Sequence, residues 1–513
     1  MVLEKNAINI YRDKALVHFE GQDFLGQIGI DSRIFRALNN GGISVGVISQ
    51  QAIENGISVL VDEKDAEHAV ELLNTEFSKE KSKGIVSAIY SVMDLSVVGF
   101  VSENYNKILS ELQRNQIFPL LLNQVASAGR VNLVVTKNQT EICKNIIETE
   151  IYGKPKPVHL ALIGHGNVGS TLIEQILDSA YDILNRKRID LKIVAISNSK
   201  KMALNQAGFG SDWRQKINYS QTETSVENLI DFVHEYSLEN LIVVDNTASK
   251  DFVKNYETFV DGGFDVVSSN KVFNTLPIAE YRNFRGVLNK NKKKYFYETN
   301  VGAGLPLIDT IKLLHLSGEN ITRIKGVFSG SLSYIFNNFS VRDDKFSTII
   351  GEAMEKGFTE PDPREDLSGN DVARKLLILA RELDLINEFS DINVQNLIPQ
   401  NLLEISKDEF ISRIPELDEE YQKIKGNQKP NHVLRYVGDL HGDLQQDKGE
   451  LDVKLISVPA NSALGQLKGS DSIFEIYTES YGENPIVIMG AGAGAQVTAR
   501  GVFGDILRIS EHK

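Results

Sequence analysis

Apolar and amphipathic segments follow one another in the same order twice within the first 150 residues. Short apolar runs of strand length alternate with segments whose apolar residues recur at the period of a helix. The first copy starts with the run 15–19 and the second with the run 95–100. In each copy a helical segment, two further apolar runs and another helical segment follow. The pattern predicts two β-α-β-β-α units, each plausibly closed by one more strand, with a period of 74 residues measured from Gln50 to Gln124.

Units of this size are typical of ferredoxin-like folds, and two in tandem resemble ACT domains. We place their boundaries at 1–82 and 83–152. The resemblance implies that Gln50 and Gln124, each at the end of the second strand of its copy, bind an amino-acid effector, with threonine expected. The first copy has the expected Gly-rich loop at 21–26, whereas the second has no glycine at 101–104. The alternative is that both glutamines are only solvated strand ends.

The linker 153–157 contains two prolines and separates these units from an apolar run at 158–163. A GxGxxG loop and a helical segment come next, and an apolar run at 191–196 completes a β-α-β unit. This order is the dinucleotide-binding fingerprint, in which glycines let the backbone approach a pyrophosphate at a helix N-terminus. The predicted cofactor-binding residues of this loop are Gly164, Gly166, Asn167, Val168 and Gly169.

The tip of the second strand of this unit indicates which dinucleotide binds. An NAD site expects an acidic residue there, but this chain has Asn198, Ser199, Lys200 and Lys201. An amide, a hydroxyl and lysines accept a 2′-phosphate, so NADP is favoured over NAD. The alternative is that the lysines are ordinary solvated surface.

Two later apolar runs, 241–245 and 264–267, also end in polar residues. Ligands of open α/β sheets lie beyond the carboxyl ends of the strands, so these tips should face the nicotinamide. The candidates are Thr247, Ser269 and Lys271. A lysine in such a cleft can meet developing negative charge, although Lys271 can also be read as a surface lysine.

Three further segments, 298–306, 329–335 and 357–375, together with the Gly-rich loop and residues 269–271, closely resemble homoserine dehydrogenases. The resemblance runs from about residue 158 to the C-terminus. It implies NADPH-dependent reduction of aspartate 4-semialdehyde to homoserine. It also implies an α/β architecture with a Rossmann-type doubly wound cofactor domain at 153–301 and 483–513. An α+β substrate and dimerisation domain is expected at 302–482, and the assembly is expected to be a homodimer or homotetramer.

The longest segment carries the candidate catalytic residues. Asp371 and Lys375 are four positions apart on a predicted helix, so their side chains point the same way. Reduction of an aldehyde needs a hydride at carbon and a proton at oxygen, and an amine of lowered pKa can supply the proton. We favour Lys375 as the donor and Lys271 as the neighbouring cation, although the two roles cannot be separated from sequence. Glu360 and Asp371 would hold the substrate ammonium, and Asp366 would orient the site.

The resemblance also implies a structural site for Na⁺ or K⁺, made by the carboxylate of Glu298 and the backbone at Val301, Ala303 and Leu305. Hard oxygen ligands suit such ions. A second Gly-rich turn at 490–494 precedes another helical segment, which is expected to rejoin the cofactor domain. Gly494 would then lie near the nicotinamide, unless these glycines serve only helix packing.

Composition narrows the function classes further. The 55 basic and 69 acidic residues give a net charge of −14, which argues against a nucleic-acid binder. No apolar run approaches the ~20 residues that span a bilayer, and the N-terminus has no signal-like apolar segment, so a cytoplasmic protein is expected. The single cysteine, Cys143, excludes a disulfide framework.

Three alternatives were weighed against this interpretation. Aspartate-semialdehyde dehydrogenase chemistry needs a thiol nucleophile, and Cys143 lies before the cofactor domain. A non-catalytic amino-acid or NADP sensor would be expected to lack Lys375 or Asp371, and both are present. The kinase activity of bifunctional aspartokinase–homoserine dehydrogenases is not carried over, because only about 14 residues precede the first predicted strand.

Overall fold

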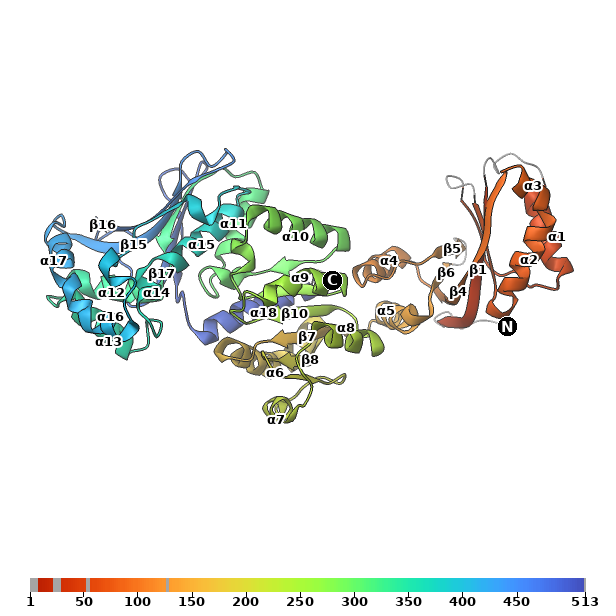
Figure 1. Ribbon diagram of the computed structural model, residues 1–513, viewed down its shortest axis with the longest axis horizontal. Helices are drawn as coiled ribbons and strands as arrows, with labels where there is room; N and C mark the ends of the chain where they lie inside the picture. Colours follow the sequence, from red (N-terminus) through yellow and green to blue (C-terminus); the bar gives the residue numbers. More distant parts are fainter. Residues whose placement is uncertain (1–7, 22–28, 52–55, 126–128, 512–513) are drawn as a thin grey trace.

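The computed structural model describes residues 8–21, 29–51, 56–125 and 129–511. Its three parts lie in a row, with the N-terminal units at one end, the cofactor domain in the middle and the substrate domain at the other end (Figure 1). No helix within these ranges is long and apolar enough to cross a membrane.

The N-terminal region forms one six-stranded sheet in the order β2-β3-β1-β4-β6-β5. Helices α1–α3 lie at the outer end of the molecule, and α4 and α5 face the cofactor domain (Figure 1). The elements are β1 (Asn9–Gly21), α1 (Ile30–Asn40), β2 (Ile48–Gln51), β3 (Gly56–Asp62), α2 (Ala66–Glu76), α3 (Ser78–Ser82), β4 (Val86–Val101), α4 (Tyr105–Arg114), β5 (Leu121–Val125), β6 (Arg130–Thr136) and α5 (Thr140–Tyr152).

The two longest strands, β1 and β4, each serve both units. The later part of β1 pairs with β3 and the early part of β4, whereas its start at Asn9–Tyr11 pairs with the late part of β4. Both strands have an irregularity at an aspartate of positive φ, Asp13 (55°) and Asp94 (56°). The predicted boundary between 82 and 83 comes before β4, and the structure shows that this one strand closes the first unit and opens the second.

Apolar side chains hold the two units together. Each unit buries its own helices against one side of its strands. A further buried cluster joins residues of both units and consists of Leu16, Leu60, Leu95, Val97, Leu121 and Val134. The tandem units thus fold together as one domain with a shared sheet and a shared apolar cluster.

The cofactor domain is a doubly wound sheet in the order β12-β11-β10-β7-β8-β9, parallel except for β9. The strand order reverses between β7 and β10, the point at which such sheets bind ligands. Its elements are β7 (Lys156–Ile163), α6 (Asn167–Lys187), β8 (Ile189–Ser197), β9 (Met202–Leu204), α7 (Trp213–Tyr219), α8 (Val226–Glu235), β10 (Leu241–Asp245), α9 (Tyr256–Asp261), β11 (Asp265–Ser268), α10 (Ile278–Asn291) and β12 (Tyr295–Phe296).

The second ACT unit contacts the cofactor domain at the edge opposite its ligand-binding edge. The Lys156 ammonium, at the start of β7, lies 2.7 Å from Glu111 of α4. The Gln116 amide donates to the carbonyl of Val260, and Lys293 donates to the carbonyl of Arg114. The second of the N-terminal units and the cofactor domain therefore meet through specific polar contacts.

The substrate domain has the third six-stranded sheet of the molecule, in the order β14-β16-β15-β13-β17-β18. Its elements are α11 (Leu307–Leu316), β13 (Ile321–Val327), α12 (Gly330–Val341), α13 (Phe346–Glu355), α14 (Arg364–Leu367), α15 (Asn370–Arg381), β14 (Ile392–Val394), α16 (Lys407–Arg413), α17 (Asp418–Gly426), β15 (His432–His441), β16 (Glu450–Pro459), β17 (Ser472–Thr478) and β18 (Ile486–Gly490).

The chain returns to the cofactor domain later than predicted. Strand β18 pairs antiparallel with β17 and so belongs to the substrate domain, which corrects the boundary placed at residue 483. Within the C-terminal segment that starts at residue 483, α18 (Ala495–Glu511) is the element that packs in the cofactor domain. There Val502 and Ile506 share an apolar cluster with Leu172 of α6.

Candidate active site

The Gly-rich loop has the shape that a pyrophosphate requires. Gly164 has φ +85°, and a Cβ added there would lie 2.9 Å from the Thr247 side chain. At Gly169 an added Cβ would lie 1.9 Å from the Gly164 carbonyl oxygen, so α6 packs closely on the loop. Nothing lies within 4 Å of such an atom at Gly166, the residue before α6. The loop therefore presents open backbone at a helix N-terminus, with Asn167 and Val168 in its first turn.

The tip of β8 is organised around Asn198. Its Oδ1 accepts hydrogen bonds from the backbone N–H groups of Lys200 and Lys201, and its Nδ2 lies 3.1 Å from Nε2 of His165. Lys201 donates to the carbonyl of Asn218, whereas Ser199 and Lys200 are exposed. His165, in the Gly-rich loop, was missed from sequence because it occupies a variable position of the fingerprint.

A buried carboxylate fixes the tips of β10 and β11. Asp245 accepts hydrogen bonds from the Thr247 N–H (2.8 Å), the Tyr256 hydroxyl (2.7 Å) and the Asn270 amide (3.1 Å). Burial raises the pKa of Asp245, although these hydrogen bonds partly offset the effect. Asn270 directly precedes Lys271, so this network holds the segment that carries the predicted lysine.

Asn246 belongs to the polar tip of β10 but is not among the predicted cofactor-binding residues. Its Oδ1 lies 3.3 Å from the Ser269 hydroxyl, and its backbone packs against Gly164. Among the residues that the structure describes, its Nδ2 is buried without a hydrogen-bond partner. Buried donors are normally satisfied, and this one lies at the switch point where sheets of this kind bind ligands. The signal is the polar run that begins at Asp245, the last residue of the buried strand β10.

Two lysines and an aspartate meet where the domains join. On α15, the Lys375 ammonium lies 2.7 Å from Asp371 Oδ2 and donates to the carbonyl of Phe328 at 2.8 Å. From the cofactor domain, Lys271 Nζ lies 3.9 Å from Asp371 Oδ1. Lys375 has 11% of its side chain exposed, against 34% for Lys271 and 46% for Asp371. The predicted catalytic residues are therefore brought together, and Lys271 and Asp371 are only partly accessible to solvent.

These charges shift one another's protonation. Asp371 tends to raise the pKa of Lys271, but burial and the positive charges of Lys375 and Arg374 outweigh it, so that pKa is lowered. Burial alone would raise the pKa of Asp371, but Lys375 and Lys271 hold it well below its usual range. Asp371 is thus ionised at neutral pH, and Lys271 gives up its proton more easily than a free lysine does.

The remaining predicted substrate residues lie in the loop before α15. Asp366 accepts hydrogen bonds from the Ser331 hydroxyl (2.6 Å) and the Glu360 backbone N–H (2.8 Å), so it fixes this loop against α12. Glu360 is exposed, but partial loss of hydration and the nearby charges of Asp366, Glu365 and Asp371 raise its pKa. Ser331 was not singled out from sequence because nothing local to it marks a partner 35 residues away.

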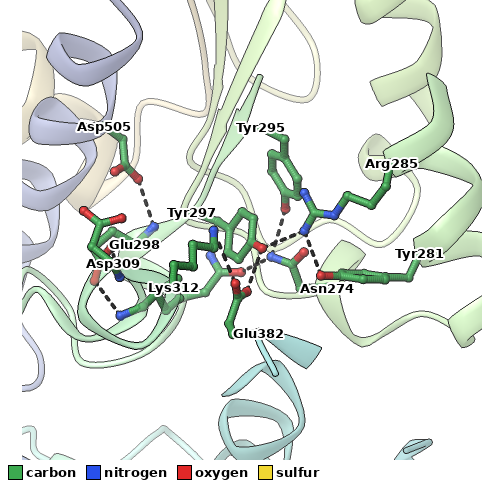
Figure 2. A network of polar contacts seen from close by, with 12 residues as sticks. Asn274, Tyr281, Arg285, Tyr295, Tyr297, Glu298, Asp309, Lys312, Glu382 and Asp505 are labelled. Carbon is green, nitrogen blue, oxygen red and sulfur yellow. Dashed lines mark hydrogen bonds and ion pairs between the residues drawn. The ribbon is translucent and has the colours of Figure 1, made fainter. Parts of the chain in front are cut away.

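Glu298 lies in the turn Glu298–Asn300 that follows β12, close to Asp309, Lys312 and Asp505 (Figure 2). Its oxygens accept the backbone N–H groups of Ile308 (2.8 Å) and Asp309 (3.0 Å), and its own N–H donates to Asp505 at 2.9 Å. Burial and the Asp505 charge raise the pKa of Glu298 to about 7, and burial raises that of Asp505 to about 7. A cavity of about 390 Å³ is lined by both carboxylates, by Leu305 and by Arg508, whose guanidinium lies 3.8 Å from Glu298.

Three predicted ligand-binding positions, Gly494, Gln124 and Gln50, lie outside the site described so far. Gly494 has φ +119° and precedes α18, where the carbonyl of Gln496 accepts a hydrogen bond from Gln175 of α6. Gln124 is exposed on the edge strand β5. The side chain of Gln50 and most of the 21–26 loop lie outside the described residues.

Cys143 cannot serve as a nucleophile in this arrangement. It is fully buried in the core of the second ACT unit, and burial raises its pKa to about 12. Thioester chemistry needs an accessible thiolate next to the cofactor, so that alternative fails.

Comparisons with known proteins agree with this geometry. The family model described as homoserine dehydrogenase matches residues 306–507, its NAD-binding domain matches 164–298, and an ACT domain matches 17–77. A homoserine dehydrogenase from Emericella nidulans is 35% identical over 371 residues, which cover 69% of this chain and 99% of that protein.

Bifunctional aspartokinase/homoserine dehydrogenases match almost the whole chain. The chloroplastic enzyme 1 of Arabidopsis thaliana is 36% identical over 97% of the chain, and that of Haemophilus influenzae is 34% identical over 99%. The chain spans 55% and 63% of the lengths of these two relatives.

Among solved structures, a Candida auris protein of unknown function superposes with a TM-score of 0.63 and 33% identity, covering 69% of this chain and 99% of that one. A putative homoserine dehydrogenase from Archaeoglobus fulgidus, at 21% identity and a TM-score of 0.55, shares the fold. The chain belongs to the homoserine dehydrogenase family.

Proposed function

We propose that this chain reduces L-aspartate 4-semialdehyde to L-homoserine with NADPH. The observation that carries the proposal is the meeting of Lys271, Asp371 and Lys375 at the junction between a dinucleotide fold and the substrate domain. A bound nicotinamide would supply the hydride. The chain itself must hold the aldehyde, supply a proton to its oxygen and stabilise the charge that develops there.

Either lysine could supply the proton, and their surroundings differ. Lys375 is held by two acceptors and is well placed to fix the carbonyl oxygen or to donate its third N–H proton. Lys271 has a lowered pKa and a single, longer ionic contact, which suits proton transfer. The preference for Lys375 as donor stays a prediction, and Lys271 is now its direct competitor.

Acidic residues would recognise the ammonium group of the substrate. Asp371 is ionised and 46% exposed, and Glu360 lies close enough for their charges to interact. Asp366 would act by holding the loop rather than by touching the substrate, because Ser331 and the Glu360 N–H both bind it.

The dinucleotide is proposed to be NADP rather than NAD. The tip of β8 offers the exposed side chains of Ser199 and Lys200 and no carboxylate. His165, beside Asn198, adds a further donor. A 2′-phosphate would meet positive charge there, whereas an NAD site would need an acidic partner for the ribose.

A monovalent cation is proposed beside Glu298. Glu298, Asp505 and Asp309 line one cavity, and Arg508 is in ionic contact with all three carboxylates, so a second cation would balance the charge there. Glu298 would hold the ion with backbone oxygens of Val301, Ala303 and Leu305, and the ion would stabilise the fold without taking part in the reaction.

Threonine is proposed as the effector of the ACT pair, bound near Gln50 and Gln124. Its support is the ACT match and the polar contacts that join the second unit to the cofactor domain. A homodimer or homotetramer is proposed through the substrate domain, whose edge strand β18 exposes Val487 (44%) and Met489 (57%).

The test is an initial-rate assay of NADPH absorbance with L-aspartate 4-semialdehyde, repeated with NADH and with threonine. Turnover that is faster with NADPH and falls on adding threonine is the expected result. A non-catalytic sensor would bind NADPH without consuming it, and that outcome would replace the enzyme assignment.

A further inference from the structure

Two consecutive side chains at the C-terminal end of α15 are buried in contacts with the cofactor domain. Arg381 is 3% exposed and Glu382 is 8% exposed. Charged groups are rarely buried unless they are paired, and both have a partner here: Arg381 lies 3.3 Å from Glu388, and Glu382 lies 3.4 Å from Lys312. Neither residue belongs to the cluster of Lys271, Asp371 and Lys375.

Glu382 is bound through a tyrosine of the cofactor domain (Figure 2). The Tyr297 hydroxyl, directly after β12, donates to Glu382 Oε1 at 2.6 Å and accepts from Arg285 of α10 at 2.6 Å. Arg285 also contacts the Tyr281 hydroxyl at 3.0 Å. On the other side, Lys312 of α11 lies 3.4 Å from Glu382 Oε2 and 4.2 Å above the Tyr297 ring.

Arg381 is bound to the segment that follows Lys271. Its Nη1 donates to the carbonyl of Asn274 at 2.7 Å. The Asn274 amide donates to Asn300, and the Asn300 amide donates to the carbonyl of Ser268. The chain of contacts therefore reaches both sides of the segment 269–273, which carries Lys271.

The geometry of α15 connects these anchors to the reacting groups. Glu382 follows Lys375 by about two turns of a 3.6-residue helix, so the two side chains leave the same face about 10 Å apart. One end of this face presents Lys375 and Asp371 to the cleft, and the other is fixed to the cofactor domain. A small rotation of α15 about its buried end would change the separation of Lys375 and Lys271.

We propose that Arg381 and Glu382, with Tyr297 as the partner of Glu382, are positioning residues that set α15 against the cofactor domain. They thereby fix the distance between the lysine pair and a bound nicotinamide. The inference rests on the proposed function, because it assigns these residues a part in hydride transfer.

The test compares two buried tyrosines in the full-length chain. Tyr297→Phe removes the hydroxyl that joins Glu382 to Arg285 and keeps the ring. Tyr421→Phe is the matched control, because Tyr421 of α17 is also 2% exposed and donates one hydrogen bond, to the carbonyl of Leu397. For each variant the measurements are kcat, both KM values, the Kd of NADPH, and the isotope effect on kcat with NADPH deuterated at the transferred hydrogen.

Tyr297→Phe should lower kcat by about tenfold to a hundredfold, the cost of misplacing reacting groups by about 1 Å. The isotope effect should rise because hydride transfer becomes slower, while the Kd of NADPH stays the same because the Gly-rich loop is not touched. Tyr421→Phe should keep the kcat and the isotope effect of the wild type. If Tyr297 had a purely structural role, Tyr297→Phe would behave like Tyr421→Phe. Both variants would then lose thermal stability, and neither would show a raised isotope effect.

Wild-type turnover with the same kcat and isotope effect in both variants would overturn this inference alone. If the wild type does not oxidise NADPH with the aldehyde, the proposed function fails, and this inference fails with it. Should Tyr297→Phe not fold, Glu382→Gln decides, because it keeps an acceptor for Tyr297 and removes the charge that faces Lys312. An unchanged kcat in Glu382→Gln would then contradict the proposal, and a lowered kcat with unchanged NADPH binding would support it.

Discussion

The cofactor loop and the lysine cluster are built in opposite ways. The loop is one continuous segment, and its shape comes from glycine backbone at Gly164 and Gly169. The cluster takes Lys271 from one domain and Asp371 and Lys375 from another, and its distances depend on how the domains pack. Substitutions that alter the shape of the Gly-rich loop should therefore lie close to it. The distances within the lysine cluster can also be altered by substitutions far from the cluster, wherever they change how the two domains pack.

The largest effect is expected at Lys375. Lys375→Ala should lower kcat by about a hundredfold to ten-thousandfold, the usual contribution of a proton-transferring group, while NADPH still binds. Lys423→Ala is the control, since Lys423 forms the same kind of pair, with Glu419 four positions earlier, on the exposed surface of α17. Near-normal turnover of Lys375→Ala would assign proton donation to Lys271, and Lys271→Ala should then show the larger loss.

The cofactor loop should respond to added volume instead of lost charge. Gly169→Ala would place a Cβ 1.9 Å from the Gly164 carbonyl oxygen, so the loop must shift and NADPH affinity should fall by about tenfold or more. Gly351→Ala is the control, because an added Cβ in that helix meets nothing within 4 Å and should leave NADPH binding unchanged. Fluorescence titration of NADPH measures both, and equal affinities would mean that the pyrophosphate binds elsewhere.

The difference between the Gly-rich loop and the lysine cluster also explains which site residues could be proposed from the sequence. Three features are each encoded within one short segment, so the residue pattern was enough to propose them: the Gly-rich loop, the tips of β10 and β11, and the helix carrying Asp371 and Lys375. Ser331, Phe328 and Asn274 contribute through partners in other segments. Nothing in the local sequence marks such partners, because only tertiary packing brings them together.

Specificity for the dinucleotide should depend on fewer contacts. Replacing Lys200 and Lys201 together by Glu should weaken NADPH by about tenfold relative to NADH, because carboxylates repel a 2′-phosphate. The KM ratio of the two dinucleotides measures the effect. An equal loss for both would place the 2′-phosphate away from the tip of β8.

The smallest effect concerns the pH dependence of stability near Glu298. Glu298 and Asp505 each have a folded pKa of about 7, above their ordinary values of 4.5 and 3.8. In that window the folded state binds more protons than the unfolded state, so without Na⁺ or K⁺ the free energy of unfolding should fall as pH rises toward 7. Saturating K⁺ should restore about 1 kcal/mol above pH 7 in the wild type and less in Glu298→Gln. A K⁺ effect that is equal in both proteins would remove Glu298 from the cation site.

The differences between the predicted boundaries and the structure have a common physical origin. Strand β4 runs through both ACT units, and β18 adds to the substrate sheet just before the chain returns to the cofactor domain. Apolar alternation predicts that a strand exists but does not say which neighbour it pairs with. The Asp13 and Asp94 irregularities, where β1 and β4 pass between units, are visible only in the backbone.

A single-turnover experiment tests the central claim most directly. The NADPH-loaded chain is mixed rapidly with L-aspartate 4-semialdehyde, and absorbance of the reduced nicotinamide is followed in the wild type and in Lys375→Ala. Rapid loss of one equivalent per chain in the wild type, and a far slower loss in the variant, is the expected result. Binding of both ligands to the wild type with no loss of absorbance would contradict it.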